Sequence, residues 1–301
     1  MSEVSPLRKP QIIFDDLTSN MRFLNNGSTE RRSFNIAGKV ALITGGVSGL
    51  GLSFAKDLLK HQLRGLALAD INYNLGQSIC HELNEEYGEG KVIFINMDVV
   101  DMNQFKDAFE ETVAVFGNVD ILINNAGILD DRLWTKEIAI NITGTINGII
   151  LGLETYLQKH RTGSEAVIAN ICSISGIGGK MAFPCPLYTC SKFAVHGLTI
   201  TFGCPEHFQR TGVRVVAVCP GVTETPLVHN FVNRTLGDPY EKLCKVYFES
   251  HSLQRAESCA RAMTKVIQSA PPGTLWVSEG DEEPYQYILP DRFKIPKVYM
   301  E

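Results

Sequence analysis

From residue 40 onwards, short continuous apolar runs alternate with longer segments whose apolar residues recur at helical spacing. The short runs are typical of strands buried on both faces, and the longer segments predict helices with one apolar face. The predicted strands are residues 40–44, 65–70, 92–97, 120–124, 166–171, 213–219 and 274–277. The predicted helices between them are residues 52–61, 75–87, 104–116, 136–159 and 188–209.

This alternation predicts an α/β fold, with a doubly wound Rossmann-type parallel sheet of about seven strands and helices on both sides. No repeat or linker divides residues 36–301, so we expect a single domain. Residues 1–35 show no periodicity and predict a flexible N-terminal extension. Residues 223–262 combine turn residues with short helical patches, and we expect them to form an insertion that covers the substrate.

Composition and charge narrow the classes of function. Of the 301 residues, 44% are hydrophobic and 20% are charged, which is typical of a folded globular chain. A formal net charge of −5 gives no general attraction for phosphate backbones, so we expect no nucleic-acid partner. No apolar run approaches the roughly 18 residues of a membrane span. The 8 cysteines show no metal-ligand spacing, so we expect no metal and a reducing, cytoplasmic location.

A glycine-rich turn, TGGVSGLG at residues 44–51, follows the first predicted strand and opens the first predicted helix. Such a turn lets the backbone approach a phosphate, which the N–H groups and the dipole of a helix N-terminus then hold. Asp70 ends the second predicted strand, where an acidic side chain can accept both ribose hydroxyls of an adenosine and repel a 2′-phosphate. A close charge pair is worth roughly 1–4 kcal/mol, which favours NAD over NADP by about ten-fold or more.

Tyr188 and Lys192 are four residues apart in a predicted helix and therefore share one face of it. An ammonium about 4 Å from a phenolate, at an effective dielectric constant of about 20, contributes about 4 kcal/mol. We therefore expect Lys192 to lower the pKa of Tyr188 from about 10 towards about 7. A phenol that titrates near neutrality is an efficient general acid and base.

Small, polar and glycine residues also follow three further predicted strands. These segments are NNAG at 124–127, NICSISG at 170–176 and CPGVTET at 219–225. The carboxyl ends of parallel strands meet at one edge of a sheet, so these segments and the glycine turn predict a single ligand site.

As a set, these motifs resemble those of the short-chain dehydrogenase/reductase family. The resemblance covers about residues 37–280, and it also includes Asp98-Val99, Asn141, Ser173 and YTCSK at 188–192. Within the family, the sequence is most similar to insect alcohol dehydrogenases and NAD-linked hydroxyprostaglandin dehydrogenases. That similarity rests on Asp70, on NNAGILDD at 124–131 and on WVSEG at 276–280.

The resemblance implies a catalytic set and a cofactor site. Tyr188 is the implied acid/base, and Lys192 assists it and binds the nicotinamide ribose. Ser173 is implied to bond the substrate oxygen, and Asn141 to hold a water that links Lys192 to solvent. The implied NAD site comprises Gly45, Ser48, Gly49, Leu50, Gly51, Asp70, Asp98, Val99, Asn125, Ala126, Gly127, Tyr188, Lys192, Pro220, Gly221, Thr223 and Thr225. The cofactor's own chemistry would transfer the hydride.

Two departures from the family pattern affect these expectations. The usual spacing places the serine thirteen residues before the tyrosine, at Ser175, whereas the S-x-x-G pattern selects Ser173. We prefer Ser173, because the glycines at 178–179 can absorb two extra residues. Pro205 is expected to kink or end a helix that forms an oligomer interface in many relatives, in a chain that we expect to be a homodimer or homotetramer.

The sequence therefore predicts an NAD-dependent oxidoreductase that interconverts a secondary alcohol and a ketone on an apolar small molecule. The apolar character is inferred from side chains expected to wall the substrate cleft: Met181, Phe183, Leu227, Val228, Phe231, Tyr247 and Phe248. The alternative is a non-catalytic NAD(H)-binding sensor or scaffold protein. A pseudoenzyme has no physical reason to keep Asn141, Ser173, Tyr188 and Lys192 together.

Overall fold

A computed structural model describes residues 33–178, 183–229, 231–249, 253–291, 293–298 and 300, apart from the side chain of Val232. Residues 34–301 form one compact unit. Most of the predicted N-terminal extension, residues 1–32, lies outside the described residues. Phe34 and Ile36 are buried in the core, and the backbone N–H of Phe34 donates to the carbonyl of Gln268 at 2.8 Å.

Eight strands form one sheet in the order β3-β2-β1-β4-β5-β6-β7-β8. Every neighbouring pair is parallel except β7 and β8, which are antiparallel. The strands are β1 (Val40–Thr44), β2 (Gly65–Asp70), β3 (Val92–Asn96), β4 (Ile121–Asn124), β5 (Ala166–Ile171), β6 (Val213–Pro220), β7 (Leu275–Ser278) and β8 (Tyr285–Tyr287). The strand order reverses between β1 and β4, which is where doubly wound sheets bind their ligands.

The longer helices are α2 (Gly49–Lys60), α3 (Tyr73–Tyr87), α4 (Met102–Phe116), α8 (Pro186–Phe202), α9 (Pro205–Thr211), α10 (Tyr240–Glu249) and α11 (Ala256–Ser269). A run of shorter helical segments covers η1 (Asp131–Leu133), α5 (Trp134–Ile138), η2 (Ala139–Gly144), α6 (Thr145–Leu151), η3 (Gly152–Tyr156) and α7 (Leu157–His160). Two short turns are η4 (Ile174–Gly176) and η5 (Phe231–Arg234).

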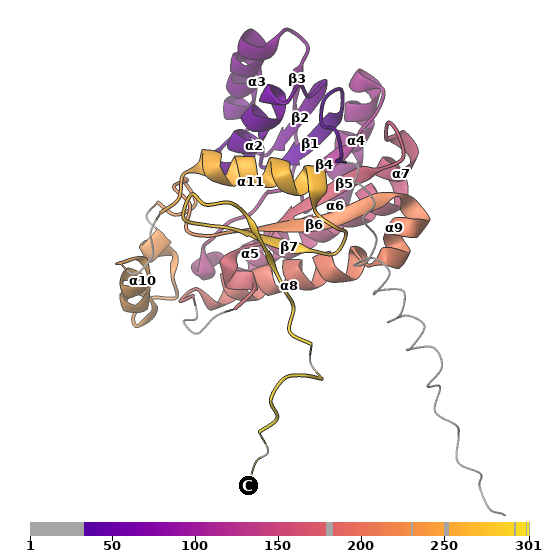
Figure 1. Ribbon diagram of the computed structural model, residues 1–301. Helices are drawn as coiled ribbons and strands as arrows, with labels where there is room; N and C mark the ends of the chain where they lie inside the picture. The colour runs from indigo at the N-terminus through magenta and orange to yellow at the C-terminus, as the bar shows by residue number, and fades with distance from the viewer. Residues whose placement is uncertain are drawn as a thin grey trace, which may run out of the picture. The chain divides into compact units, whose positions relative to one another are not determined.

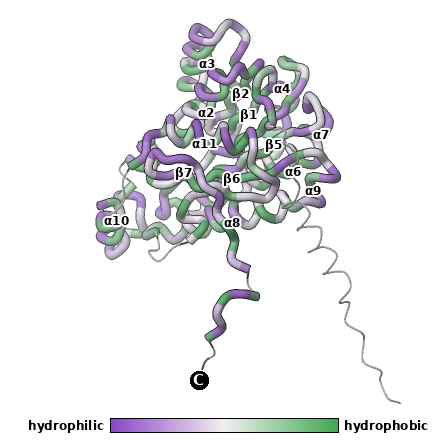
Figure 2. The backbone as a smooth tube through the Cα atoms, in the orientation of Figure 1, coloured by the Kyte–Doolittle hydropathy of each residue, from purple (hydrophilic) through white to green (hydrophobic). Residues whose placement is uncertain are grey.

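Helices cover both faces of the sheet, with α11 crossing in front of it and α8 running below it in Figure 1. One face packs against α2, α3 and α11, and the other against α4, the α6–α7 run and α8. Strands β1, β4, β5 and β6 are buried along their whole length, because helices on both sides exclude water from them. Figure 2 accordingly shows hydrophobic residues along the central strands and many hydrophilic ones on outer helices such as α3.

The parallel, doubly wound sheet confirms the predicted fold class, with two differences in detail. The prediction of about seven strands omits β8, because its three residues are not buried and give no apolar run. The predicted helix at residues 188–209 is divided in two, since α8 ends at Phe202 and α9 begins at Pro205. A proline has no backbone N–H to donate, so it begins a helix here rather than continuing one.

One continuous helical stretch among the described residues, Asp131–His160, is long and apolar enough to cross a membrane by length and composition alone. Within this stretch, the most apolar segment of 18 residues has a mean hydropathy of 1.3, and 44% of that segment is buried. The sequence pattern, which is interrupted by Asn147, Gly148 and Glu154, does not predict this. Ile149 and Leu153 are fully buried against the sheet, as expected for the core helix of a folded domain.

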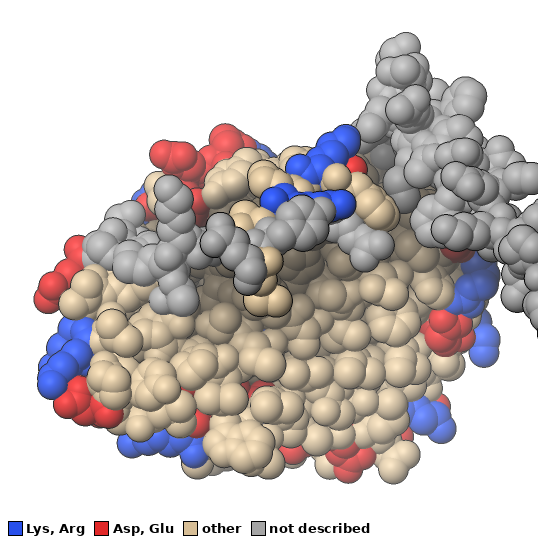
Figure 3. Space-filling model, turned by 90° about the horizontal axis from the view of Figure 1, so that it is seen from below, with Lys and Arg blue, Asp and Glu red and all other residues tan. Residues whose placement is uncertain are grey.

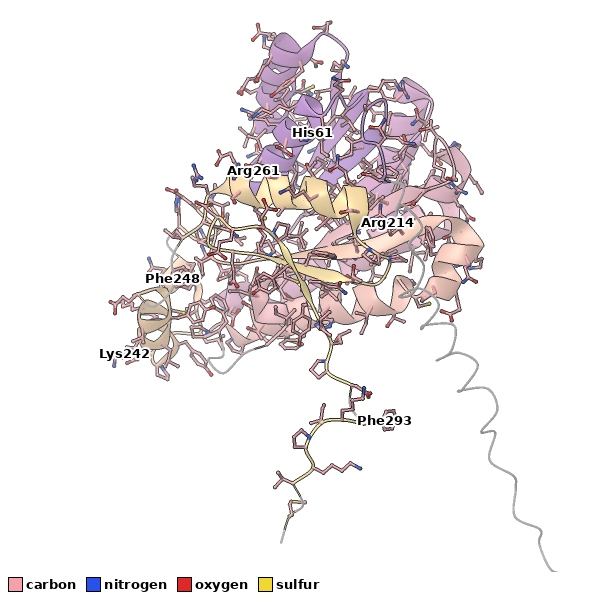
Figure 4. The ribbon with its side chains drawn as sticks, in the orientation of Figure 1. His61, Arg214, Lys242, Phe248, Arg261 and Phe293 are labelled. Atoms are coloured by element: carbon pink, nitrogen blue, oxygen red, sulfur yellow. The ribbon has the colours of Figure 1, made fainter. Side chains whose placement is uncertain are left out.

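The predicted covering insertion is divided between two structural roles. Figure 4 labels Phe248 and Lys242, which both belong to α10 at the edge of the domain. The ring of Phe248 packs on that of Phe231 with centroids 4.2 Å apart, whereas Lys242 is 77% exposed. From Ala256 onwards the chain is α11, which packs in the core, so the part that can cover a ligand ends before that residue.

Candidate active site

The glycine turn passes so close to the exit of β4 that two of its residues cannot carry a side chain. Gly45 has a φ of +61°, and a Cβ there would lie 2.9 Å from the Cα of Ala126. A Cβ on Gly51 would lie 2.2 Å from the carbonyl oxygen of Gly45. Both contacts are with backbone atoms, so a larger residue would separate the turn from its neighbours.

The N-terminus of α2 is open to a ligand. Its cap residue, Ser48, makes no side-chain hydrogen bond to the helix, and the first turn contains no acidic residue. Ser48, Gly49 and Leu50 line a cavity at the carboxyl edge of the sheet. Backbone N–H groups and the positive end of the helix dipole are therefore available there for an anion.

Thr44 and Asn125 fasten this turn to the segment after β4. Thr44 Oγ1 accepts hydrogen bonds from the backbone N–H groups of Asn125 and Ala126, each at 3.0 Å. Asn125 Nδ2 donates to the carbonyls of Thr44 and Gly45, each at 2.9 Å. The Asn125 amide thus braces the glycine turn, in addition to lining the cavity beside Ala126 and Gly127.

Two carboxylates line the cavity at the exits of β2 and β3. Asp70 Oδ1 accepts the N–H of Asn72 at 3.0 Å, and Asp98 Oδ1 accepts the N–H of Val100 at 3.0 Å. The ion pairs among the described residues do not include Asp70. This part of the cavity therefore carries negative charge, with Val99 as an apolar neighbour.

Tyr188 and Lys192 lie on the buried face of α8, with 7% and 5% exposure. Lys192 Nζ is 5.6 Å from the centroid of the Tyr188 ring and donates to the carbonyl of Ile171 at 2.9 Å. The side chain of Ser173 interacts with the phenol in the direction that lowers the pKa of Tyr188. Ser173 Oγ also accepts the N–H of Ser175 at 3.1 Å. Both candidate serines line the cavity, and Ser173 is the one whose side chain acts on the pKa of Tyr188.

The expected effect of Lys192 on Tyr188 is wrong for the protein on its own. Burial raises the pKa of Tyr188 above its ordinary value, although the side chain of Ser173 acts in the opposite direction. Burial also lowers the pKa of Lys192. The physical reason is desolvation, because the simple charge-pair argument omits the cost of ionising two groups away from water.

Asn141 joins the segment after β4 to α8. It lies in η2, a π-helical turn, and is 1% exposed. Its Oδ1 accepts the N–H of Ile128 at 2.9 Å, and its Nδ2 donates to the carbonyl of Ile128 at 2.9 Å and to Ser191 Oγ at 3.0 Å. Short π-helical turns inside α-helices frequently occur at functional sites.

A single cavity brings the predicted residues together. Gly51 and Asn141 are the predicted site residues that do not line it, because Gly51 lies behind Gly45 and Asn141 behind Gly127. The predicted residues in its wall are Gly45, Ser48, Gly49, Leu50, Asp70, Asp98, Val99, Asn125, Ala126, Gly127, Ser173, Tyr188, Lys192, Pro220, Gly221, Thr223 and Thr225.

The predicted apolar wall also meets this cavity. Phe183 lies with its ring centroid 5.8 Å from that of Tyr188 and 5.1 Å from that of Tyr247. Leu227, Val228, Tyr247 and Phe248 line the cavity with it, while Phe231 packs behind them. Met181 lies outside the described residues. Apolar and aromatic side chains therefore surround the space beside the Tyr188 hydroxyl.

Asp131 is a functional residue that the sequence does not single out. It is fully buried, and its Oδ1 and Oδ2 accept the N–H groups of Tyr188 and Leu187, each at 3.1 Å. It therefore caps the N-terminus of α8 from another segment, since the side chain of the cap residue, Cys185, makes no hydrogen bond to the helix. A cap that is distant in sequence leaves no local signal.

Two further buried polar residues of this region, Glu137 and Gln254, also give no local signal in the sequence. Glu137 is fully buried, and burial raises its pKa to about 7. Gln254 is 1% exposed, and its Nε2 donates to Thr223 Oγ1 at 2.9 Å and to the carbonyl of Ser278 at 2.7 Å. Gln254 thereby fixes the position of Thr223 in the cavity wall.

The donor set does not suggest a metal centre. Among the described residues, no group of three or more His, Cys, Asp or Glu side chains is placed to hold a metal ion. A Rossmann-type sheet with a glycine turn, and with a tyrosine, a lysine and a serine on the same cavity, instead defines an oxidoreductase architecture.

Comparison with known proteins agrees with this class. The family model described as short chain dehydrogenase matches residues 39–235. The 15-hydroxyprostaglandin dehydrogenase [NAD(+)] of Rattus norvegicus is 36% identical over 196 residues, which cover 65% of this chain and 72% of the relative. Alcohol dehydrogenase 2 of Ceratitis capitata is 31% identical over 246 residues, which cover 81% of this chain and 92% of the relative.

Solved structures share the fold. A levodione reductase superposes with a TM-score of 0.69 at 24% identity, over 81% of this chain and 97% of the other. A 3-ketoacyl-(acyl-carrier-protein) reductase from Brucella melitensis, complexed with NADH, gives a TM-score of 0.66 at 24% identity, over 81% and 98%. Since the family model matches well over half of the chain, this protein belongs to the short-chain dehydrogenase family and is an oxidoreductase.

Proposed function

We propose that this protein is an NAD-dependent oxidoreductase that interconverts a secondary alcohol and a ketone on an apolar small molecule. The observation that carries the proposal is one cavity that is lined by Ser173, Tyr188 and Lys192 and also by the glycine turn and Asp70. The names of the relatives, an NAD(+)-linked hydroxyprostaglandin dehydrogenase and an alcohol dehydrogenase, point in the same direction.

The residues of the cavity fit a dinucleotide. The open N-terminus of α2 suits a pyrophosphate, because the glycine turn has no side chains in the way and no acidic residue opposes the anion. Asp70, Asp98 and Val99 would hold the adenosine, and Asn125, Ala126 and Gly127 its ribose. The nicotinamide end would meet Tyr188 and Lys192, together with Pro220, Gly221, Thr223 and Thr225.

Asp70 favours NAD over NADP. A 2′-phosphate would lie beside this carboxylate, and no Lys or Arg is ion-paired with Asp70 among the described residues to compensate the repulsion. At the wall of a partly open cavity one such charge pair costs roughly 1–4 kcal/mol. That is a preference of about ten-fold or more.

The protein's part in the reaction is to position the alcohol and move its proton. When bound, NAD supplies the hydride acceptor. Ser173 Oγ holds the substrate oxygen beside the Tyr188 hydroxyl, since both side chains line the same cavity. Tyr188 takes the alcohol proton as a phenolate, a form that burial disfavours in the protein on its own and that the charge of Lys192 would have to stabilise. Asn141, next to Ser191 on α8, would help to pass the proton from Lys192 to solvent.

The test is NADH fluorescence with a panel of secondary alcohols of increasing apolar size, with NADP in parallel. We expect turnover with NAD, and we expect the Tyr188→Phe variant to bind NADH normally but to lose turnover by about a thousand-fold or more. Tyr156→Phe is the matched control, since its hydroxyl bonds Glu110 and it does not line the cavity. NADH binding without turnover of any alcohol or ketone would favour the sensor or scaffold function instead.

We further propose that the chain forms a homodimer or homotetramer through α8. The exposed residues of this helix include Cys190 and Phe193 but no charged side chain, and a Cβ at Gly197 would meet nothing within 4 Å. Figure 3 shows the face below the domain, where charged side chains are sparse. Light scattering should give a multiple of the 33.3 kDa chain mass, and Phe193→Asp should reduce it to one chain.

A further inference from the structure

Two buried carboxyl groups lie behind the Tyr188–Lys192 pair, and the proposed mechanism uses neither of them. Asp131 caps α8 through the N–H groups of Leu187 and Tyr188. Glu137 is also fully buried but caps nothing. Buried carboxyl groups are costly unless they are bonded or charge-balanced, so the position of Glu137 calls for a physical reason.

Glu137 faces α8 from the neighbouring helical run. It lies one helical turn before Asn141, so the two side chains share the face that packs on α8. Glu137 Oε2 accepts the N–H of Asp130 at 3.0 Å, and Oε1 has no hydrogen-bond partner among the residues that the structure describes. Oε2 is therefore held in place by a hydrogen bond. No hydrogen bond stabilises Oε1, whether the carboxyl is ionised or protonated.

The groups that interact electrostatically with Glu137 come from the segment before α5 and from α8 with the residue that precedes it, since η2 has no titratable side chain. Asp130 and Asp131 belong to the segment before α5, and Tyr188 and Lys192 belong to α8. The thiol of Cys185, just before α8, also interacts with it. Lys192 is the cation of this set, and it interacts with Glu137 in a dry interior where charges act strongly.

We propose that Glu137 is a positioning residue for Tyr188 and Lys192, whose buried carboxyl sets the electric field across that pair and thereby the pH range of turnover. The inference rests on the proposed function, because it assumes that Tyr188 exchanges the substrate proton. Glu137 itself touches neither the cavity nor the reacting atoms.

The direction of the effect follows from the charges. Burial raises the pKa of Glu137 to about 7, so the carboxyl is neutral in mild acid and charged in mild base. Burial is the main cause that raises the pKa of Tyr188, and the charge of Glu137 adds to it. For Lys192, burial lowers the pKa and the charge of Glu137 opposes that change. An ionised Glu137 therefore moves the titration of both groups to higher pH.

The first experiment is the pH dependence of kcat/KM for NAD-linked oxidation of a secondary alcohol, in the wild-type chain and in Glu137→Gln. Below about pH 6 the two enzymes should have the same profile, because Glu137 is then protonated. Above pH 7 the two profiles should separate. The kcat/KM of the variant should reach its maximum, and then decline, at pH values roughly one unit lower than those of the wild-type chain. Glu137→Asp should keep the wild-type shape, and the exposed Glu111→Gln is the matched control.

A second measurement does not depend on turnover. The folded state holds a proton on Glu137 up to about pH 7, whereas an unfolded glutamate releases it near its ordinary value of 4.5. Wild-type stability should therefore fall relative to Glu137→Gln as the pH rises through this interval. We expect the difference between their melting temperatures to change by about 5 °C between pH 5 and pH 8.

The outcomes separate this inference from the proposed function. Parallel pH profiles, with Glu137→Gln merely slower at every pH, would show a structural role and overturn the inference. A wild-type chain that turns over no alcohol or ketone would refute the proposed function, and the electrostatic argument would then be decided by the melting temperatures. If the melting temperatures of the wild-type chain and of Glu137→Gln change in parallel from pH 5 to pH 8, the inference about Glu137 is overturned.

Discussion

The two sides of the cavity are built in different ways. At the exits of β1 and β4, backbone meets backbone, and the carbonyl oxygen of Gly45 lies where a Cβ of Gly51 would stand, 2.2 Å away. On the opposite side, the wall consists of aromatic rings from separate segments, such as Phe183, Tyr247 and Phe248. The first side is fixed by glycines and main-chain bonds, and the second by side-chain packing.

This difference separates what is general from what is particular to the chain. A site made from backbone accepts a ligand common to many enzymes, and few residue types satisfy its geometry. A site made from packed side chains can change shape with each substitution while the fold is kept. Substitutions in the glycine turn, on the proposed cofactor side, should therefore abolish the binding of NADH. Substitutions in the aromatic wall, on the proposed substrate side, should change which alcohols are preferred.

The largest effect is expected at Gly51. In Gly51→Val, the new Cβ would overlap the carbonyl oxygen of Gly45, so the turn must open. Its backbone N–H groups would then no longer point towards the pyrophosphate. We expect NADH affinity to fall by about a hundred-fold or more, which is roughly 3 kcal/mol. Fluorescence titration measures it. Gly197→Ala, where a Cβ meets nothing within 4 Å, is the control, and equal affinity in Gly51→Val would refute the argument.

The next effect concerns Asp131, which caps the helix that carries Tyr188. Asp131→Ala would leave the buried N–H groups of Leu187 and Tyr188 without acceptors and remove a carboxylate from the N-terminus of α8. We expect a loss of about 2–3 kcal/mol in the free energy of unfolding. Urea denaturation checks this. Asp131→Asn should be milder, because it keeps one acceptor, and a wild-type stability of Asp131→Ala would contradict the capping role.

A smaller effect is expected from Asp70→Ala. Removing this carboxylate should reduce the preference for NAD over NADP by about ten-fold, because the repulsion of a 2′-phosphate disappears. The measurement is kcat/KM with each cofactor at one ionic strength. Asp57→Ala is a carboxylate control that does not line the cavity. An unchanged ratio would mean that Asp70 does not meet the adenosine ribose.

The smallest effect should come from the aromatic wall. Phe248→Ala should raise KM for bulky apolar alcohols by roughly five-fold, since part of the apolar surface that would contact them is lost. Small alcohols and NADH should bind as before. Lys242→Ala, on the exposed side of the same helix, should change nothing. If both variants affect small and bulky substrates alike, α10 does not contact the substrate.

The sequence predicts the cofactor side of this cavity far better than its surroundings. The glycine turn and Asp70 lie in the cavity wall, as the sequence predicts, because each follows the strand that positions it. Asp131 and Gln254 escape prediction because their partners are distant in the chain. The Tyr188 pKa is mispredicted for a related reason, since the desolvation that controls it depends on how the whole chain packs around the phenol.

β8 has a consequence for the behaviour of the chain at high concentration. β7 ends the parallel part of the sheet, and without a neighbour its Leu275–Ser278 backbone would offer unpaired N–H and C=O groups to any other extended chain. By pairing with it through Tyr285–Tyr287, β8 closes that row with a strand only three residues long, too short to template further pairing. The C-terminal hairpin thereby acts as protection against edge-to-edge aggregation.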